Sequence, residues 1–345
     1  MTKNHRVKTA ASILVLSLVL AACGSKNNNG PDAPTSTPSP TASPTETAPE
    51  PTETASLPPT KDSSELIAKH YREMTLAGAP AQEAYGELKK SMEQVQPAQA
   101  DELIRTLEQF YEQDLPKAEK SFEEPEVQQA LIELDWPITE QEVAKLKDEE
   151  VRALVENTVA GGYKVETAEG YYFPVVDYGR LLTYGDQVSI SMKAYLDLRA
   201  RESDAPSAKD AALVISWDEL ASRLLASESY LVTFPDTPER QKAEQSFLRY
   251  LSFYFIGLSN TPIFDDETFA IRPELKTQYE QMAASHGETI SGQFAKELLS
   301  ILEESKGQLF VKSDNGEQTD VPAVKKFRDK LQDEALAKLP AAKNN

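Results

Sequence analysis

From residue 62 onward, apolar residues recur at intervals of three and four, which is the spacing of one face of an α-helix. Within residues 62–160 this pattern predicts three apolar faces: Leu66, Ile67, His70, Tyr71 and Met74; Leu103, Ile104, Leu107, Phe110 and Tyr111; and Val127, Ala130, Leu131 and Leu134. We therefore expect residues 62–160 to form a run of amphipathic helices with short connections.

Residues that mark helix ends agree with this periodicity. Thr139 with Glu142, and Ser216 with Glu219, have the spacing of a capping box at a helix start. Prolines that suit a first helical turn and glycines that suit a helix end stand at Pro80, Pro97, Pro125, Gly161, Gly162 and Gly307. Both kinds of signal predict where helices begin and end.

The pattern changes after Gly161–Gly162. Residues 163–167 and 171–176 are rich in aromatic and β-branched residues and flank Ala168-Glu169-Gly170, which predicts a small β-hairpin near residues 163–176. Pro174 cannot donate to a strand ladder, so its strand is expected at an edge or with a bulge. Helical spacing resumes near Tyr178 and predicts helices over 186–201, 216–230, 238–257, 273–285, 288–305 and 322–338.

The predicted fold class is mainly α: a helical bundle or irregular helical array with this one small hairpin. The segment from Phe247 to Leu258 is apolar almost all round, so its helix is expected to be central and enclosed by others. We divide the folded part into an N-terminal helical region, 62–160, and a C-terminal helical region with the hairpin, 161–340. Whether the two form one continuous domain is left open by the sequence.

The first 22 residues have the pattern of a secretory signal peptide. Lys3, Arg6 and Lys8 precede an apolar stretch from Ala10 to Leu20, and small residues precede Cys23. A helix that spans a bilayer needs roughly 20 apolar residues, so this stretch is too short for a membrane span.

Leu20-Ala21-Ala22-Cys23 matches the lipobox at every position, and the whole segment resembles the precursor of a bacterial lipoprotein. The resemblance implies that Cys23 is alkylated with diacylglycerol and becomes the lipidated mature N-terminus, with acyl chains such as palmitate in the lipid bilayer. It places the protein on the extracytoplasmic face of the cell membrane. The alternative is an ordinary secretory peptide with an incidental cysteine. Residues 161–275 are also similar to uncharacterised lipoproteins of Gram-positive, spore-forming bacteria.

Residues 23–61 are predicted to be the lipidated N-terminus and a disordered tether. The segment from residue 26 is rich in Pro, Thr, Ser and Glu and holds almost no large apolar side chain. Extended polyproline II segments at ~3.1 Å per residue would give it a reach on the order of 100 Å, enough to cross a thick cell wall.

Composition narrows the function classes. The chain carries 36 Lys and Arg against 56 Asp and Glu, a formal net charge of −20, so a basic footprint for nucleic acid is missing and we predict no nucleic-acid partner. Cys23 is the only cysteine, so the domain is expected to have neither a disulfide nor a thiol nucleophile.

Candidate chemistry is sparse. His70 and Glu73 share a helix face, but a half-buried histidine beside an incidental acid is the commoner case, so we predict no metal site and no cofactor. Acids near aromatic residues are typical of sugar-binding and glycosidase clefts. For the hydrolase alternative the candidate catalytic residues are Glu166, Glu169 and Asp177. The candidate ligand-binding residues are Tyr163, Tyr171, Tyr172 and Tyr178.

Two functions follow. The first is a non-catalytic module, tethered to the membrane, that binds an unknown envelope protein or ligand. The alternative is a cell-wall or polysaccharide hydrolase that uses the carboxylates near residues 166–186. A transporter's solute-binding protein is disfavoured, because such proteins alternate strands and helices in two α/β lobes.

Overall fold

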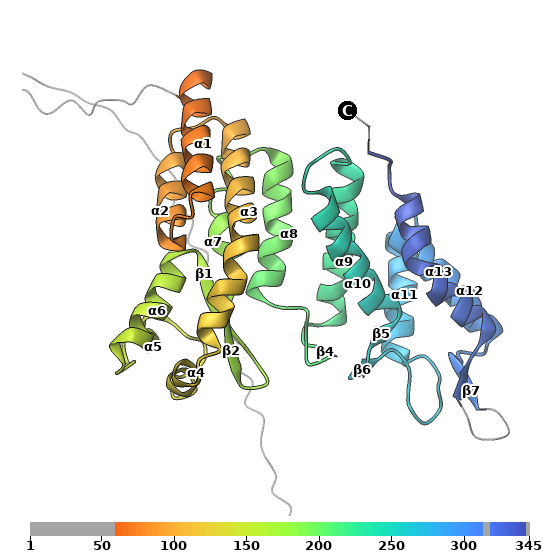
Figure 1. Cartoon of the computed structure of the whole chain (residues 1–345). Coiled ribbons are helices and arrows are strands. Elements are labelled where there is room, and N and C mark those ends of the chain that lie inside the picture. The colour runs from red at the N-terminus through yellow and green to blue at the C-terminus, as the bar shows by residue number, and fades with distance from the viewer. Residues whose placement is uncertain (1–58, 313–317, 343–345) are drawn as a thin grey trace, which may run out of the picture. The chain divides into compact units, whose positions relative to one another are not determined.

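The computed structural model describes residues 59–312 and 318–342, whose elements are labelled in Figure 1. The predicted signal peptide, Cys23 and the tether up to residue 58 lie outside the described residues. Within them are thirteen helices: α1 (Lys61–Leu76), α2 (Ala81–Met92), α3 (Pro97–Phe122), α4 (Pro125–Leu131), α5 (Glu140–Val143), α6 (Glu149–Ala160), α7 (Tyr178–Leu182), α8 (Ile190–Asp204), α9 (Trp217–Thr233), α10 (Arg240–Phe255), α11 (Pro273–Ser285), α12 (Ile290–Glu304) and α13 (Pro322–Lys338).

The strands form four two-stranded antiparallel sheets. They are β1 (Tyr163–Ala168) with β2 (Tyr171–Val176), β3 (Ala208–Lys209) with β4 (Ala212–Leu213), β5 (Gly257–Leu258) with β6 (Thr261–Pro262), and β7 (Phe310–Lys312) with β8 (Gln318–Asp320). The mainly α class is confirmed, with three hairpins in addition to the one predicted. Strands of two or three residues are too short for an alternating pattern to predict.

The predicted hairpin forms at residues 163–176, as β1 and β2. Glu166 pairs with Phe173 and Pro174 pairs with Val165, so the proline stands in a two-stranded ladder whose strands are both edges. Glu169 and Gly170 both have positive φ, 51° and 76°, as a two-residue hairpin turn requires.

Helices pack mainly on neighbours in the chain, as Figure 1 shows for α1–α3, for α9 with α10 and for α11–α13. α8 packs on α7 and α9, and so connects the first helices to the later ones. One apolar core runs through these contacts from Ala68 in α1 to Leu339 after α13. A smaller core lies between the end of α3, α4, α6 and the hairpin, around Phe122 and Val155. The described residues belong to one compact unit.

The predicted central helix is α10. Phe247, Leu251, Tyr254 and Phe255 are each at most 1% exposed, and α9 and α13 pack against this helix. Thr139 and Ser216 accept from the backbone N–H groups of Glu142 and Glu219, as the capping signals predicted.

The apolar face predicted for the first helix is only partly correct: Tyr71 is buried and Ile67 and Met74 pack half-buried on the main core. α1 buries Ser64, Ala68, Tyr71 and Thr75, whereas Leu66 is 68% exposed and His70 is also exposed. Small side chains suit close packing on α3, and the Ser64 hydroxyl donates to the Thr60 carbonyl and accepts from the Gln96 N–H. A satisfied polar group can be buried at little cost, so an apolar pattern could not find Ser64 and Thr75.

Among the described residues, none of the helices combines the length and the apolar character that a membrane crossing requires.

Candidate functional site

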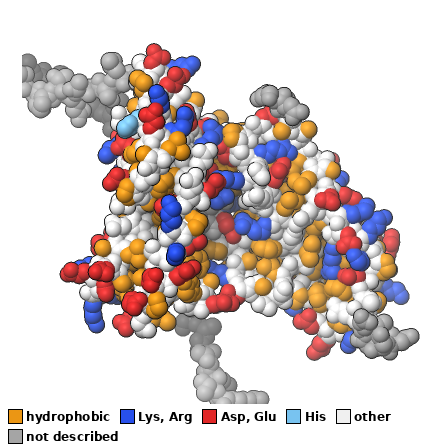
Figure 2. Space-filling model, in the orientation of Figure 1, with side chains coloured by type: hydrophobic (Ala, Val, Ile, Leu, Met, Phe, Trp, Pro, Cys, Tyr) orange, Lys and Arg blue, Asp and Glu red, His pale blue; other side chains and the backbone are white. Residues whose placement is uncertain are grey.

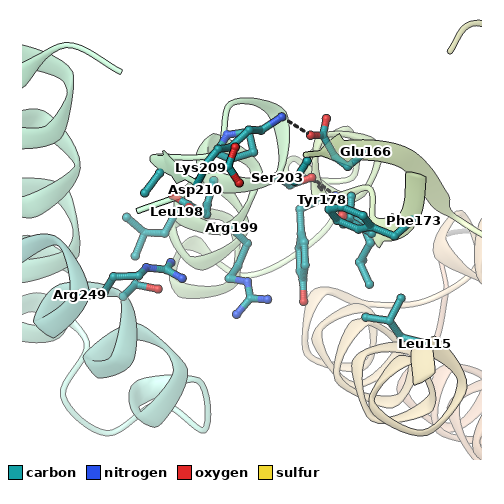
Figure 3. A pocket seen from close by; sticks show the side chains of 17 residues that line it. Leu115, Glu166, Phe173, Tyr178, Leu198, Arg199, Ser203, Lys209, Asp210 and Arg249 are labelled. Carbon is teal, nitrogen blue, oxygen red and sulfur yellow. Dashed lines mark hydrogen bonds and ion pairs between the residues drawn. The ribbon is translucent and has the colours of Figure 1, made fainter. Parts of the chain in front are cut away.

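A cleft of about 550 Å³ opens between the β1–β2 hairpin, α8 and α10, and we call it the α8–α10 cleft. Figure 2 shows this face of the molecule hollowed near its middle, with Lys and Arg side chains at the border of the hollow. Figure 3 shows the lining side chains. Apolar walls come from Leu115, Phe173, Val175 and Leu198, and polar groups come mainly from α8, α10 and the turn around Lys209.

Beneath the cleft, a buried carboxylate holds two phenols in place. Glu108 of α3 is 4% exposed, and its Oε1 accepts hydrogen bonds from Tyr178 at 2.6 Å and from Tyr195 at 2.7 Å. Lys242 lies 3.4 Å from the other carboxylate oxygen. Burial first, and the Glu108 charge next, raise the pKa of Tyr178 and Tyr195 well above the usual range, so both phenols remain protonated donors.

These two phenols support an arginine. The guanidinium of Arg199 lies 4.4 Å from the centre of the Tyr178 ring and 6.0 Å from that of Tyr195, in cation–π geometry. Burial lowers the pKa of Arg199, but the surrounding phenols and Glu108 together raise it above its usual value. Arg199 is therefore a fixed positive charge in the wall of the cleft.

Arg249 of α10 is the second arginine of the cleft. It is exposed, and Figure 3 shows its side chain extending into the cleft toward Arg199. Its guanidinium lies 5.4 Å from the Tyr250 ring. Neither Arg199 nor Arg249 forms an ion pair or a hydrogen bond with a described residue. The other described arginines all donate to a carboxylate or a carbonyl oxygen.

The carboxylates that line the cleft are mostly engaged. Glu166 accepts from Lys209 at 2.7 Å, the contact drawn at the top of Figure 3. Glu202 accepts from Tyr250 and Ser207 and pairs with Arg223. Asp210 stands in the exposed β3–β4 turn with φ 50°, without an ion pair among the described residues. The unpaired charges in the cleft are thus two guanidinium groups and one carboxylate.

The three carboxylates named from the sequence are not brought together. Glu166 lines the α8–α10 cleft, whereas Glu169 lies exposed in the β1–β2 turn. Asp177 accepts from the Arg180 N–H as the N-cap of α7 and lines a different depression, beside Val159 and Arg180.

The four tyrosines also separate. Tyr178 lines the cleft, and Tyr163 is buried with its hydroxyl donating to Asp114 at 2.9 Å. Tyr172 belongs to the smaller core, and Tyr171 is 41% exposed on the hairpin. Of the candidate residues, only Glu166 and Tyr178 lie at the cleft.

Within the described ranges, no group of three or more His, Cys, Asp and Glu side chains is arranged to hold a metal ion. His70 and Glu73 are both exposed on α1, and Glu73 pairs with Lys69. The polar groups of the cleft suit an anion, because its two unpaired cations, Arg199 and Arg249, outnumber its one unpaired carboxylate, Asp210.

Sequence reasoning missed Arg199, Lys209 and Arg249. They come from three separate elements and follow no motif spacing. The one signal available was Arg199 four residues after Tyr195, the distance at which side chains on a helix meet.

Searches against protein-family models, curated proteins and solved structures gave no match to this chain.

Proposed function

We propose that the protein is an extracytoplasmic lipoprotein, anchored to the membrane through Cys23, whose helical domain binds a ligand in the α8–α10 cleft without catalysing a reaction. The basic and apolar N-terminal segment and the lipobox at residues 20–23 support the anchor. The Pro-, Thr- and Ser-rich segment that follows supports a spacer between the membrane and the domain.

The observation that carries the binding function is the cleft itself. Its volume of about 550 Å³ is typical of small-molecule sites, and apolar walls surround a few convergent polar groups. Arg199 and Arg249 line this space without a partner among the described residues, and a ligand could satisfy both.

The positions and contacts of the three candidate carboxylates favour binding over hydrolysis. A glycosidase needs two carboxyl groups that face one bond, one of them protonated. Glu166 is held by Lys209, Asp177 caps a helix and Glu169 lies in a turn. Turnover of wall or polysaccharide substrates that disappears in the triple variant Glu166→Gln, Glu169→Gln, Asp177→Asn would contradict the non-catalytic function.

Binding is tested by filling the cleft. Full-length protein in mild detergent is screened by ligand-observed NMR against small anions, cations, neutral sugars and short peptides. Ala208→Trp places an indole in the cleft, and Ala284→Trp on the exposed side of α11 is the matched control. We expect a ligand bound by the wild type and the control but not by Ala208→Trp. Lack of any binding, or equal binding by Ala208→Trp, would contradict the proposal.

The anchor is tested by Cys23→Ser. We expect the variant to appear in the medium or to remain unprocessed, and to incorporate no labelled palmitate. A variant that stays membrane-bound and correctly cleaved would show that the lipidation assignment is wrong.

A further inference from the structure

We infer that the α8–α10 cleft recognises a carboxylate or phosphate group carried on an apolar body, with Arg199 and Arg249 as the two residues that contact the anion. This inference rests on the proposed function, namely that the cleft is a ligand site. It adds three points: the charge of the ligand, the residues that bind the charged group, and the apolar character of the rest of the ligand.

The first argument is charge balance. The chain has a formal net charge of −20, so carboxylates are plentiful. None of the described ones forms an ion pair with Arg199 or Arg249, although the Glu108 charge favours the charged form of Arg199. Two guanidinium groups that face one cleft repel each other, and this repulsion grows where the walls exclude water. An anion between them removes the repulsion and gains two charge-assisted interactions.

The second argument is pre-organisation. Arg199 lies over the rings of Tyr178 and Tyr195, and both hydroxyl groups are fixed by the Glu108 carboxylate. An arginine that is already held in place loses little side-chain entropy when it binds. Its planar fork of N–H donors matches the two oxygens of a carboxylate or a phosphate. The two tyrosines and Glu108 therefore hold the Arg199 guanidinium in a defined direction. Arg249 supplies a second guanidinium from the opposite wall (Figure 3).

The third argument concerns the ligand's other part. Leu115, Phe173, Val175 and Leu198 line the cleft, so most of its wall cannot form hydrogen bonds. Lys209 is neutralised by Glu166 at 2.7 Å. An inorganic anion would leave this apolar wall in contact with water, whereas an organic anion covers it. The ligand is accordingly expected to combine an anionic group with an apolar or aromatic body.

The test uses four probes: benzoate, phenyl phosphate, inorganic phosphate and the uncharged benzamide. Dissociation constants are measured by titration calorimetry on the full-length protein in mild detergent, at two salt concentrations. We expect benzoate or phenyl phosphate to bind at least tenfold more tightly than benzamide and than inorganic phosphate, roughly the effect of one charge-assisted hydrogen bond. The tighter binder of benzoate and phenyl phosphate shows whether the cleft prefers a carboxylate or a phosphate. Raised salt should weaken its binding.

Variants assign the contacts. Arg249→Gln and Arg199→Gln should each weaken the aromatic anion about tenfold or more, since each removes one charged donor. Arg249 is exposed, so its variant tests the inference even if Arg199→Gln disturbs the fold. Asp210→Asn removes the unpaired carboxylate that lines the cleft and should tighten binding about two- to threefold, the size of an exposed charge interaction. Arg201→Gln, on the same helix but paired with Asp197, is the matched control and should change nothing.

The outcomes separate the two proposals. If benzamide binds as tightly as benzoate and phenyl phosphate, and Ala208→Trp abolishes that binding, the cleft is a ligand site and the anion inference is wrong. Aromatic-anion binding that survives both arginine substitutions would overturn it as well. If none of these probes binds, but a cationic or neutral compound binds and Ala208→Trp abolishes that binding, the anion inference is wrong and the proposed ligand-binding function stands. If nothing binds in the cleft, the proposed function itself fails.

Discussion

Glu108 is the residue on which the floor of the cleft depends. It lies inside the molecule and joins α3 to Tyr178 in α7 and to Tyr195 in α8, both through short hydrogen bonds. These partners are 70 and 87 residues away in the chain. A buried acceptor shared by two donors specifies one arrangement of three elements.

Glu108→Ala is expected to lower the free energy of unfolding by about 2–4 kcal/mol, because two buried phenols lose their acceptor. Urea unfolding followed by circular dichroism measures this change. The matched control is Glu112→Ala, one helical turn away, since Glu112 also pairs with Lys242 but is 60% exposed. It should cost no more than about 0.5 kcal/mol. Equal effects of the two substitutions would show that Glu108 does not have this role.

At this scale the sequence was a poor guide. Tyr178 was named as a candidate because aromatic residues cluster around it, but Glu108 was hidden among the charged positions of a helix that otherwise follows an amphipathic pattern. A carboxylate that faces the core has the same local pattern as one that faces water. The difference appears only when the partner elements are placed.

At the scale of elements, the chain was much more predictable. Residues 273–285 and 322–338 form α11 and α13 with the predicted bounds, because proline begins each helix at its first turn. Only part of the buried face of α1 could be found, since its other members, Ser64, Ala68 and Thr75, are small or hydroxyl side chains. The short hairpins after α8 and α10 also lacked a local signal, as two residues do not define a period.

At the scale of elements, the prediction concerns Gly162, which lies just after α6. The sequence marked Gly161–Gly162 only as a helix end, but the fold adds a steric demand. Gly162 has φ 85°, and a Cβ there would lie 2.1 Å from the Tyr111 hydroxyl and 2.5 Å from the Tyr85 ring. Both rings belong to the main core.

Gly162→Ala is expected to lower the free energy of unfolding by about 3 kcal/mol or more, the sum of backbone strain and overpacking. Gly170→Ala is the matched control, because Gly170 has a similar φ of 76° but nothing within 4 Å of its Cβ position. It should cost only about 1 kcal/mol. Thermal and urea unfolding of both variants measure the difference. Similar losses would mean that the contact with Tyr111 and Tyr85 relaxes without cost.

For the molecule as a whole, the notable property is the number of buried phenols. Loss of contact with water is the largest cause of a raised pKa at eleven tyrosines. Tyr171 is exposed and Tyr184 is half-buried, and the other nine are buried: Tyr71, Tyr111, Tyr163, Tyr178, Tyr195, Tyr230, Tyr250, Tyr254 and Tyr279. The sequence located most of these residues on helices and strands, but not their shared burial. That property depends on how separate helices close over one another to form the core.

This burial predicts loss of stability in alkali. The pKa is raised to about 12 for Tyr230 and Tyr250, against about 10 in an unfolded chain. Above pH 10 the unfolded chain therefore releases protons that the folded protein retains, and the free energy of unfolding falls as pH rises. The stabilisation is fully present below pH of about 10, and each of these two groups should have lost about 2 kcal/mol of it by pH of about 12.

Phenolate absorbance and helical circular dichroism are followed together as pH is raised. We expect most tyrosines to ionise only as helical structure is lost, so that the two transitions coincide. Tyr230→Phe removes one buried phenol, whose hydroxyl shares a hydrogen bond with the Thr237 hydroxyl, and should make the fall in stability between pH of about 10 and 12 less steep. If most tyrosines instead ionised near pH 10 while the helices persisted, the phenols would have to be accessible to hydroxide in the folded state. The support of Arg199 by protonated Tyr178 and Tyr195 would then fail in alkali before the fold does.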